Sequence, residues 1–307
     1  MKRILTGLVL LLLILWGAVY LFIPKKIRIG TITTINAALP GVFRSLSNDA
    51  SWKKFWPDST PLKMDGHIYI IKEISYNLLT IDIYSGNDTI KSTLNFIPIK
   101  SDQLTIKWSA ERMNSNGNPF KRFAIYKETL ALEKNMETIT ERLKEFMEQT
   151  KNIYGLDIKQ AKVTDSVLIS TKRLFDHQPG LKDIDDMIQS LKKYIVENGA
   201  IEKNSPMLNI FFRDSSHYEV MTAIPVDKEL PLTKEFAPKF LLKNGYILET
   251  EVKGGPYNIK TGLDELEIFK NDYKFDSPAI PYQLLVTDRL KEQDTTKWIT
   301  RLYYPIL

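Results

Sequence analysis

Aromatic side chains in the C-terminal half are the residues best suited to hold a small molecule. Trp298 and Tyr303 lie in the last strand-like segment, Tyr282 lies in the segment before it, and Tyr257 follows a Gly-Gly turn. Phe212 ends a similar segment upstream. Aromatic rings stack on planar ligands and hold cations against their faces, although each ring could equally be part of a sheet core. We predict that these rings line a largely apolar groove, the usual form of a small-molecule site.

Three carboxylates are candidates for binding or catalysis. Glu219 lies in one strand-like segment, and Glu249 and Glu251 lie in another. Strand alternation places Glu249 and Glu251 on one face, opposite Leu248 and Val252. If the apolar face packs on helices, the two acids face solvent. A groove carboxylate, Glu219 or Glu249, could instead work with a tyrosine to activate water, which would make the protein a hydrolase.

Several other classes of site find no support in the sequence. The chain has no cysteine, and its three histidines, His67, His177 and His217, are scattered, so we expect no metal site. It contains no P-loop, dinucleotide fingerprint or nucleophile elbow, and we expect no cofactor. Its 42 basic and 37 acidic residues are interspersed. This pattern favours a solvated surface, and we expect no nucleic-acid partner.

The C-terminal half contains a repeated pattern. The segment Tyr218–Val226 and the segment starting at Trp298 have the same length from the leading aromatic residue to a proline. Each follows a similar strand, Ser205–Phe212 or Pro281–Val286, and each copy also has an earlier strand and an amphipathic helix. The sequence therefore predicts two β-α-β-β units that pair about a pseudo-twofold axis and leave a groove between them.

Residues 157–307 resemble the GyrI-like effector-binding domain. The resemblance is carried by Gly254-Gly255-Pro256-Tyr257, the strands at Pro206 and Pro281, Ile224-Pro225-Val226, and Trp298 through Tyr303-Tyr304-Pro305. It implies a central groove that binds small, often cationic or aromatic, molecules, which a few members hydrolyse. Many members carry an acid three positions after the tryptophan, where this chain has Arg301. A desolvated arginine there would repel a cationic ligand.

Residues 27–152 indicate a different domain. Short alternating strands are followed by a long helix with one apolar stripe, made by Leu132, Met136, Ile139, Leu143 and Phe146. This segment resembles the START/polyketide-cyclase (SRPBCC) superfamily through Ile35-Asn36-Ala37, Val42-Phe43, Leu46 and the turn Trp52…Trp56-Pro57. The resemblance implies a helix-grip fold with an apolar cavity. Four clear strands stand between that turn and the helix, where the family has six.

The N-terminal residues predict a membrane anchor. Ile4–Ile23 carries no charge and spans roughly 30 Å as a helix, the thickness of the bilayer core. We therefore expect an α+β protein with a transmembrane helix in residues 1–26, a helix-grip domain in 27–152 and a duplicated GyrI-like domain in 157–307. Such a layout resembles a group of bacterial membrane-anchored proteins and implies a single-pass protein of the inner membrane, with the side of the soluble domains left open.

These observations support three hypotheses of function. The leading one is a membrane-anchored, non-enzymatic protein that binds a small amphipathic or aromatic molecule in the groove. Its expected contacts are Trp298, Tyr303, Tyr257, Tyr282, Glu219 and Arg301. The alternatives are a hydrolase that uses the same groove and a module that presents a surface to a protein or a lipid.

Overall fold

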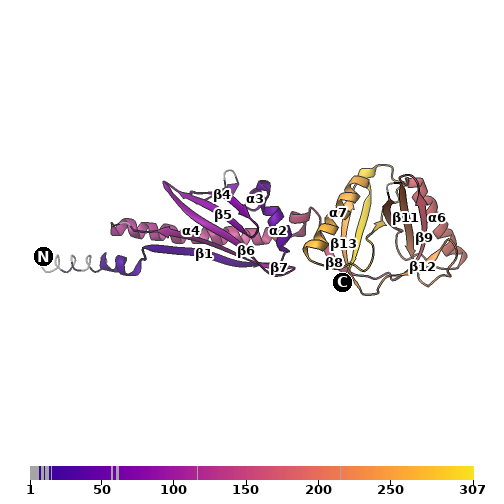
Figure 1. Cartoon of the computed structure of the whole chain (residues 1–307), viewed down its shortest axis with the longest axis horizontal. Coiled ribbons are helices and arrows are strands. Elements are labelled where there is room, and N and C mark those ends of the chain that lie inside the picture. Colours follow the sequence, from indigo (N-terminus) through magenta and orange to yellow (C-terminus); the bar gives the residue numbers. More distant parts are fainter. Residues whose placement is uncertain are drawn as a thin grey trace. The chain divides into compact units, whose positions relative to one another are not determined.

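The chain forms two compact units, Met1–Gln149 and Thr150–Leu307, here called the N-terminal and C-terminal units. A computed structural model describes residues 7, 10, 14, 16–56, 58–59, 62–115, 117–214 and 216–307. Pro57, part of the expected tryptophan turn, lies outside these residues. Each unit has its own antiparallel sheet and its own helices (Figure 1).

The N-terminal unit contains a seven-stranded antiparallel sheet in the order β1-β7-β6-β5-β4-β3-β2. Six of these strands lie between Trp56 and the long helix α4, where the sequence shows only four. The two additional strands, β2 and β3, have two and three residues, too few for a period-2 pattern to be recognised. The strands are β1 (Lys26–Ile35), β2 (Asp58–Ser59), β3 (Leu62–Met64), β4 (His67–Ser75), β5 (Leu78–Ser85), β6 (Asp88–Lys100) and β7 (Gln103–Met113).

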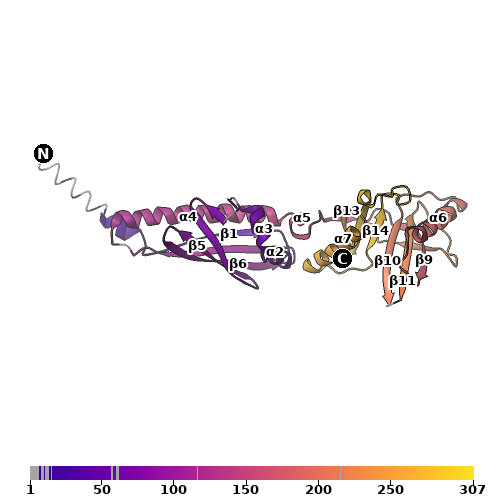
Figure 2. The same cartoon turned by 90° about the horizontal axis from the view of Figure 1, so that it is seen from above.

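Helix α4 (Pro119–Met147) runs along this sheet, as Figure 2 shows. The Asn118 side chain caps its start by accepting hydrogen bonds from the Phe120 and Lys121 amides. The predicted apolar stripe is buried at Leu132, Met136, Ile139 and Leu143. Phe146 is half-buried, and its ring centroid lies 5.6 Å from that of Phe55.

Aromatic rings fill much of the interior of the N-terminal unit. Helices α2 (Leu39–Leu46) and α3 (Asp49–Phe55) bring Trp52 beside Trp56, with ring centroids 6.0 Å apart. Tyr69 packs between Trp56 and Trp108, at 5.0 and 6.1 Å. The expected helix-grip arrangement is therefore present, and large side chains occupy the space between its sheet and its helix.

The expected transmembrane helix at Ile4–Ile23, and with it a single-pass membrane location, is contradicted. None of the helices in the described part of the chain combines the length and the apolar character needed to cross a bilayer. Residues 4–6, 8–9, 11–13 and 15 of that segment lie outside the described residues. Residues 7, 10, 14 and 16–22 are helical. Within them, the Tyr20 hydroxyl donates to the Gly117 carbonyl, next to the start of α4.

The C-terminal unit has an eight-stranded antiparallel sheet in the order β12-β9-β11-β10-β14-β15-β13-β8. Its central six strands form two β-α-β-β units, β9-α6-β10-β11 and β13-α7-β14-β15, arranged symmetrically about the β10–β14 boundary. This order confirms the predicted duplication. The elements are α5 (Thr150–Tyr154), β8 (Lys159–Lys162), β9 (Val167–Phe175), α6 (Leu181–Glu197), β10 (Met207–Asp214), β11 (His217–Pro225), β12 (Ala237–Phe240), β13 (Tyr246–Lys253), α7 (Pro256–Asp272), β14 (Tyr282–Leu285) and β15 (Ile299–Ile306).

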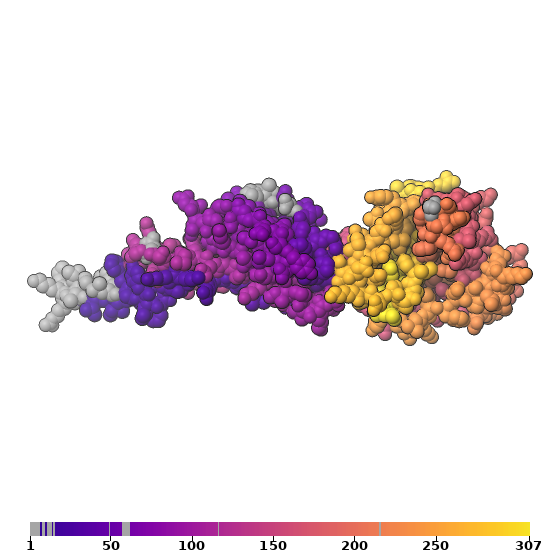
Figure 3. All heavy atoms as spheres, viewed as in Figure 1, coloured from indigo at the N-terminus to yellow at the C-terminus, as the bar shows by residue number. Residues whose placement is uncertain are grey.

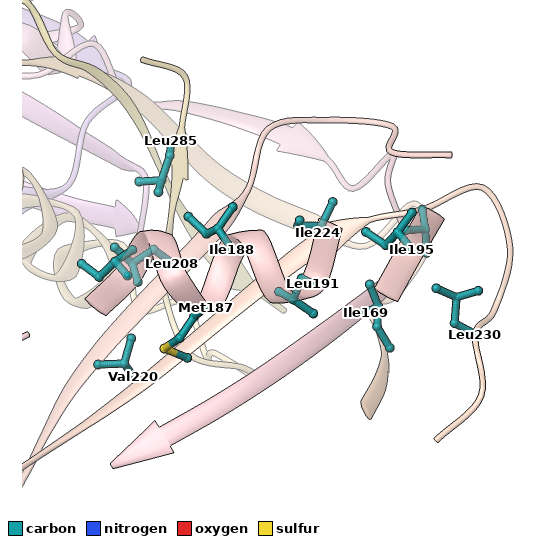
Figure 4. Close-up of a cluster of buried hydrophobic side chains, with 12 residues drawn as sticks. Ile169, Met187, Ile188, Leu191, Ile195, Leu208, Val220, Ile224, Leu230 and Leu285 are labelled. Carbon is teal, nitrogen blue, oxygen red and sulfur yellow. The ribbon is translucent and has the colours of Figure 1, made fainter. Parts of the chain in front are cut away.

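Helices α6 and α7 cover the same, outer face of the curled sheet of the C-terminal unit (Figure 1). Under α6, the side chains of Met187, Ile188, Leu191 and Ile195 point toward strand residues such as Ile224, as Figure 4 shows. Under α7, Leu266 packs with Leu248, Leu302 and Tyr304. We call this the helix face and the opposite side of the sheet the open face.

The buried stripe of α4 can be tested with two identical substitutions on one helix. Leu132 is 0% exposed and Leu130 is 38% exposed. Leu132→Ala removes buried methyl groups and leaves a cavity, so we expect a loss of about 2–5 kcal/mol in the free energy of unfolding. Leu130→Ala has the same effect on helix propensity and should cost less than about 1 kcal/mol. Urea denaturation followed by tryptophan fluorescence measures both, and equal losses would contradict the placement of α4.

Candidate functional site

The open face of the C-terminal unit carries a stacked pair of tyrosines. In the register of β14 with β15, Tyr282 lies opposite Tyr303. Their ring centroids are 5.1 Å apart and their planes are inclined by 23°. Both residues are half-buried. The structure thus brings together two of the predicted aromatic contacts at the centre of the unit.

Two cavities lie on either side of this pair and share Met207 and Tyr282 as lining residues. One has a volume of about 230 Å³ and is mostly apolar, with walls from Leu168, Ala223 and Ile280. The other has a volume of about 270 Å³ and is lined by polar groups, including Glu249 and Asp165. Figure 3 shows that both repeats reach the surface of this unit, with the second copy in orange to yellow. Together the cavities form a groove, here called the tyrosine groove, to which both repeats contribute.

Glu249 is the predicted acid that lies at the tyrosine groove. It is half-buried and stands opposite Tyr303 on the neighbouring strand. Glu251 points to the same side but is exposed, and its carboxylate lies 3.3 Å from Nε of Arg301. This pairing raises the pKa of Arg301 and offsets its charge next to the groove. Arg301 lines a separate cavity of about 320 Å³ with Glu249 and Glu251.

Glu219 lies on β11, two residues before Met221 of the apolar cavity, but it is not itself among the residues that line the tyrosine groove. Its carboxylate contacts Lys172 at 2.7 Å and Arg213 at 3.7 Å. The hydrolase hypothesis therefore gains nothing from Glu219.

Three predicted aromatic residues are not brought to the tyrosine groove. Trp298 is buried on the helix face, where its Nε1 donates to the Glu292 carbonyl at 2.8 Å. Tyr257 is 81% exposed on the first turn of α7. Phe212 is exposed beside Tyr218, near the end of the β10–β11 hairpin.

Sequence reasoning missed Asp165, Asn204 and Met207, all of which line the groove. The Asn204 amide donates to the Asp165 carboxylate at 2.9 Å. These two residues come from loops that are distant in sequence, and neither belongs to a motif. The open-face position of Met207 was the one available signal, because alternation along β10 places it opposite to Leu208.

Burial and negative charge both act on the two tyrosines. Burial raises the pKa of Tyr282, with smaller contributions from Tyr303, Asp165 and Glu249. Burial also raises the pKa of Tyr303, and the Glu249 carboxylate adds to the effect because it disfavours a second negative charge. Both hydroxyls are therefore neutral hydrogen-bonding groups at physiological pH. In the described part of the chain, no group of three or more histidine, aspartate or glutamate residues is placed to hold a metal ion.

Comparisons with known proteins yield only distant structural likenesses. No protein-family model matches the sequence, and no curated protein matches it. Among solved structures, the C-terminal domain of EcmrR is 11% identical, covers 50% of this chain and 98% of its own, and has a TM-score of 0.42. A hydrolase from Listeria innocua is 10% identical over 49% of this chain and 91% of its own, with a TM-score of 0.38. The di-domain ARO/CYC BexL from the BE-7585A biosynthetic pathway is 9% identical over 92% of this chain and 85% of its own, with a TM-score of 0.32. Because these likenesses are distant, the fold of this chain is described by its own strand order and register.

The electrostatic contact between Glu249 and Tyr303 predicts a measurable titration. Glu249→Gln removes the negative charge that disfavours tyrosinate, so the pKa of Tyr303 should fall toward its ordinary value. Ultraviolet absorbance of tyrosinate against pH measures the change, and Tyr303→Phe identifies the transition that belongs to this residue. Glu219→Gln, a matched change outside the groove, should leave that transition in place. An unchanged tyrosinate titration curve for Glu249→Gln would contradict the placement of Glu249 beside Tyr303.

Proposed function

We propose that the C-terminal unit binds a small amphipathic or aromatic molecule in the tyrosine groove between its two repeats. The observation that carries the proposal is the stacked pair Tyr282–Tyr303, which stands between an apolar and an acidic cavity. A planar ring can stack on a tyrosine of this pair while its apolar substituents contact Leu168 and Met207. The mostly apolar lining, with a few convergent polar groups, is typical of small-molecule sites.

The charge distribution favours a ligand with a cationic group. Glu249 and Asp165 both line the polar cavity. Lys162 lines it too, and its Nζ lies 5.3 Å from the centroid of the Tyr246 ring. Arg301, which the sequence suggested would repel a cation, is paired with Glu251. Two carboxylates against one lysine leave the polar cavity acidic, whereas Lys239 lines the apolar cavity. The electron-rich tyrosine faces add a further attraction for a cation.

Binding of N-methylacridinium and of neutral acridine to the full-length chain tests the proposal. At mildly alkaline pH acridine is uncharged, so the pair differs mainly in charge. We expect the cation to bind more tightly, and we expect Glu249→Gln to weaken its binding by about tenfold, or about 1.4 kcal/mol. The same substitution should affect acridine much less. Tyr282→Ala should weaken both ligands because it removes the stacking surface. Calorimetry or the fluorescence anisotropy of the dyes gives the dissociation constants.

Glu219→Gln is the matched control, since it removes an equivalent charge from the same unit outside the groove. It should change neither dissociation constant by more than about twofold. The proposal fails if neither ligand binds. It also fails if Tyr282→Ala binds both as well as the unaltered chain while remaining folded by circular dichroism.

A further inference from the structure

Arg289 lies on the helix face of the C-terminal unit, in the segment that follows β14. Its Nη2 donates to the Gln283 side-chain carbonyl at 3.3 Å and to the Thr300 hydroxyl at 3.0 Å. Its guanidinium carbon lies 4.9 Å from the centroid of the Trp298 ring. Trp298 is itself held in place by its hydrogen bond to the Glu292 carbonyl. The guanidinium is thus positioned by two neutral groups and one aromatic face.

The charge of Arg289 is not balanced within the described part of the chain. Its only hydrogen bonds there leave from Nη2 to neutral acceptors, so the N–H groups on Nε and Nη1 are available. Burial lowers the pKa of Arg289 to about 10, and the group therefore remains charged at neutral pH. Arg112 of the N-terminal unit is a useful contrast, because it contacts Asp88 at 2.9 Å and Glu128 at 3.2 Å. A partly desolvated cation is costly unless an anion pairs with it.

A cavity of about 360 Å³ lies beside Arg289, between α6 and residues 285–290. Its apolar wall comes from Ile184, Ile188 and Leu285, which belong to the core beneath α6. Figure 4 shows Leu285 at the Ile188 end of that cluster. This cavity is on the opposite side of the sheet from the tyrosine groove, because β14 directs Tyr282 to the open face and Leu285 to the helix face.

Three carboxylates also line this cavity, and two of them are paired with a lysine. Asp288 contacts Nζ of Lys291 at 3.0 Å. Glu202 lies 3.7 Å from Nζ of Lys192. Asp185 accepts a hydrogen bond from the Gln189 side chain at 3.1 Å. Among the described residues, Lys192 is thus paired with Glu202, and Arg289 is the lining cation that has no ion-pair partner.

We propose that this cavity is a second binding site, which takes a small amphipathic molecule that carries one carboxylate. The carboxylate pairs with the Arg289 guanidinium, and the apolar body lies against Ile184, Ile188 and Leu285. Charge-assisted hydrogen bonds between guanidinium and carboxylate are among the stronger polar contacts in proteins. The site does not depend on ligand binding in the tyrosine groove.

Titration of the full-length chain with octanoate, and with octanol as the neutral analogue, tests the site. Calorimetry provides the affinity of each ligand. We expect octanoate to bind more tightly than octanol, and Arg289→Gln to weaken octanoate by about tenfold or more while leaving octanol nearly unchanged. Gln189→Trp, a change at an exposed lining position on α6, should block both ligands.

Two controls assign the octanoate response to this cavity. Lys193→Gln removes an exposed charge from α6 that does not line the cavity, and it should change the octanoate affinity by less than about twofold. Tyr282→Ala, on the open face, should leave octanoate binding intact, so that failure of one site is distinguishable from failure of the other. The proposal is overturned if octanoate does not bind, if it binds no more tightly than octanol, or if folded Arg289→Gln retains the affinity of the unaltered chain.

Discussion

The antiparallel pairing of β14 with β15 is the constraint on which the C-terminal unit depends. It places Tyr282 opposite Tyr303 on the open face and Gln283 opposite Leu302 on the helix face. Because side chains alternate along a strand, a slip of one residue would send the tyrosines under the helices and expose Leu302. The stacked pair, the core under α7 and the position of Arg289 thus all follow from one register.

This register divides the unit into two chemically different surfaces. The open face combines aromatic rings with Glu249 and Asp165, so it suits a planar or cationic molecule. The helix face carries Arg289 beside an apolar wall, so it suits an anion with an apolar body. The N-terminal unit handles charge differently, because Arg112 is paired internally with Asp88 and Glu128 and the interior is occupied by aromatic rings.

Periodic patterns in the sequence predicted much of the fold. The stripe from Leu132 to Leu143 predicted α4, and the echo of Trp298 by Tyr218 predicted the duplicated unit. Short elements escaped detection: β2 and β3 contain too few residues to show alternation, and β12 lies in a connector rich in proline and charge. At Ile4–Ile23 the hydropathy of the sequence predicted a transmembrane helix, and none of the helices among the described residues is long and apolar enough to be one.

The sequence by itself determined which side chains share a face: Glu249 with Glu251, opposite Leu248 and Val252. Only the tertiary structure decided what each face meets. It placed Trp298 in the core, paired Arg301 with Glu251, and brought Asp165 and Asn204 to the stacked tyrosines. The physical reason is that alternation is a local property of one strand, set by backbone geometry. The partners of a face depend on strand pairing and loop closure between residues far apart in the chain, which no local pattern encodes.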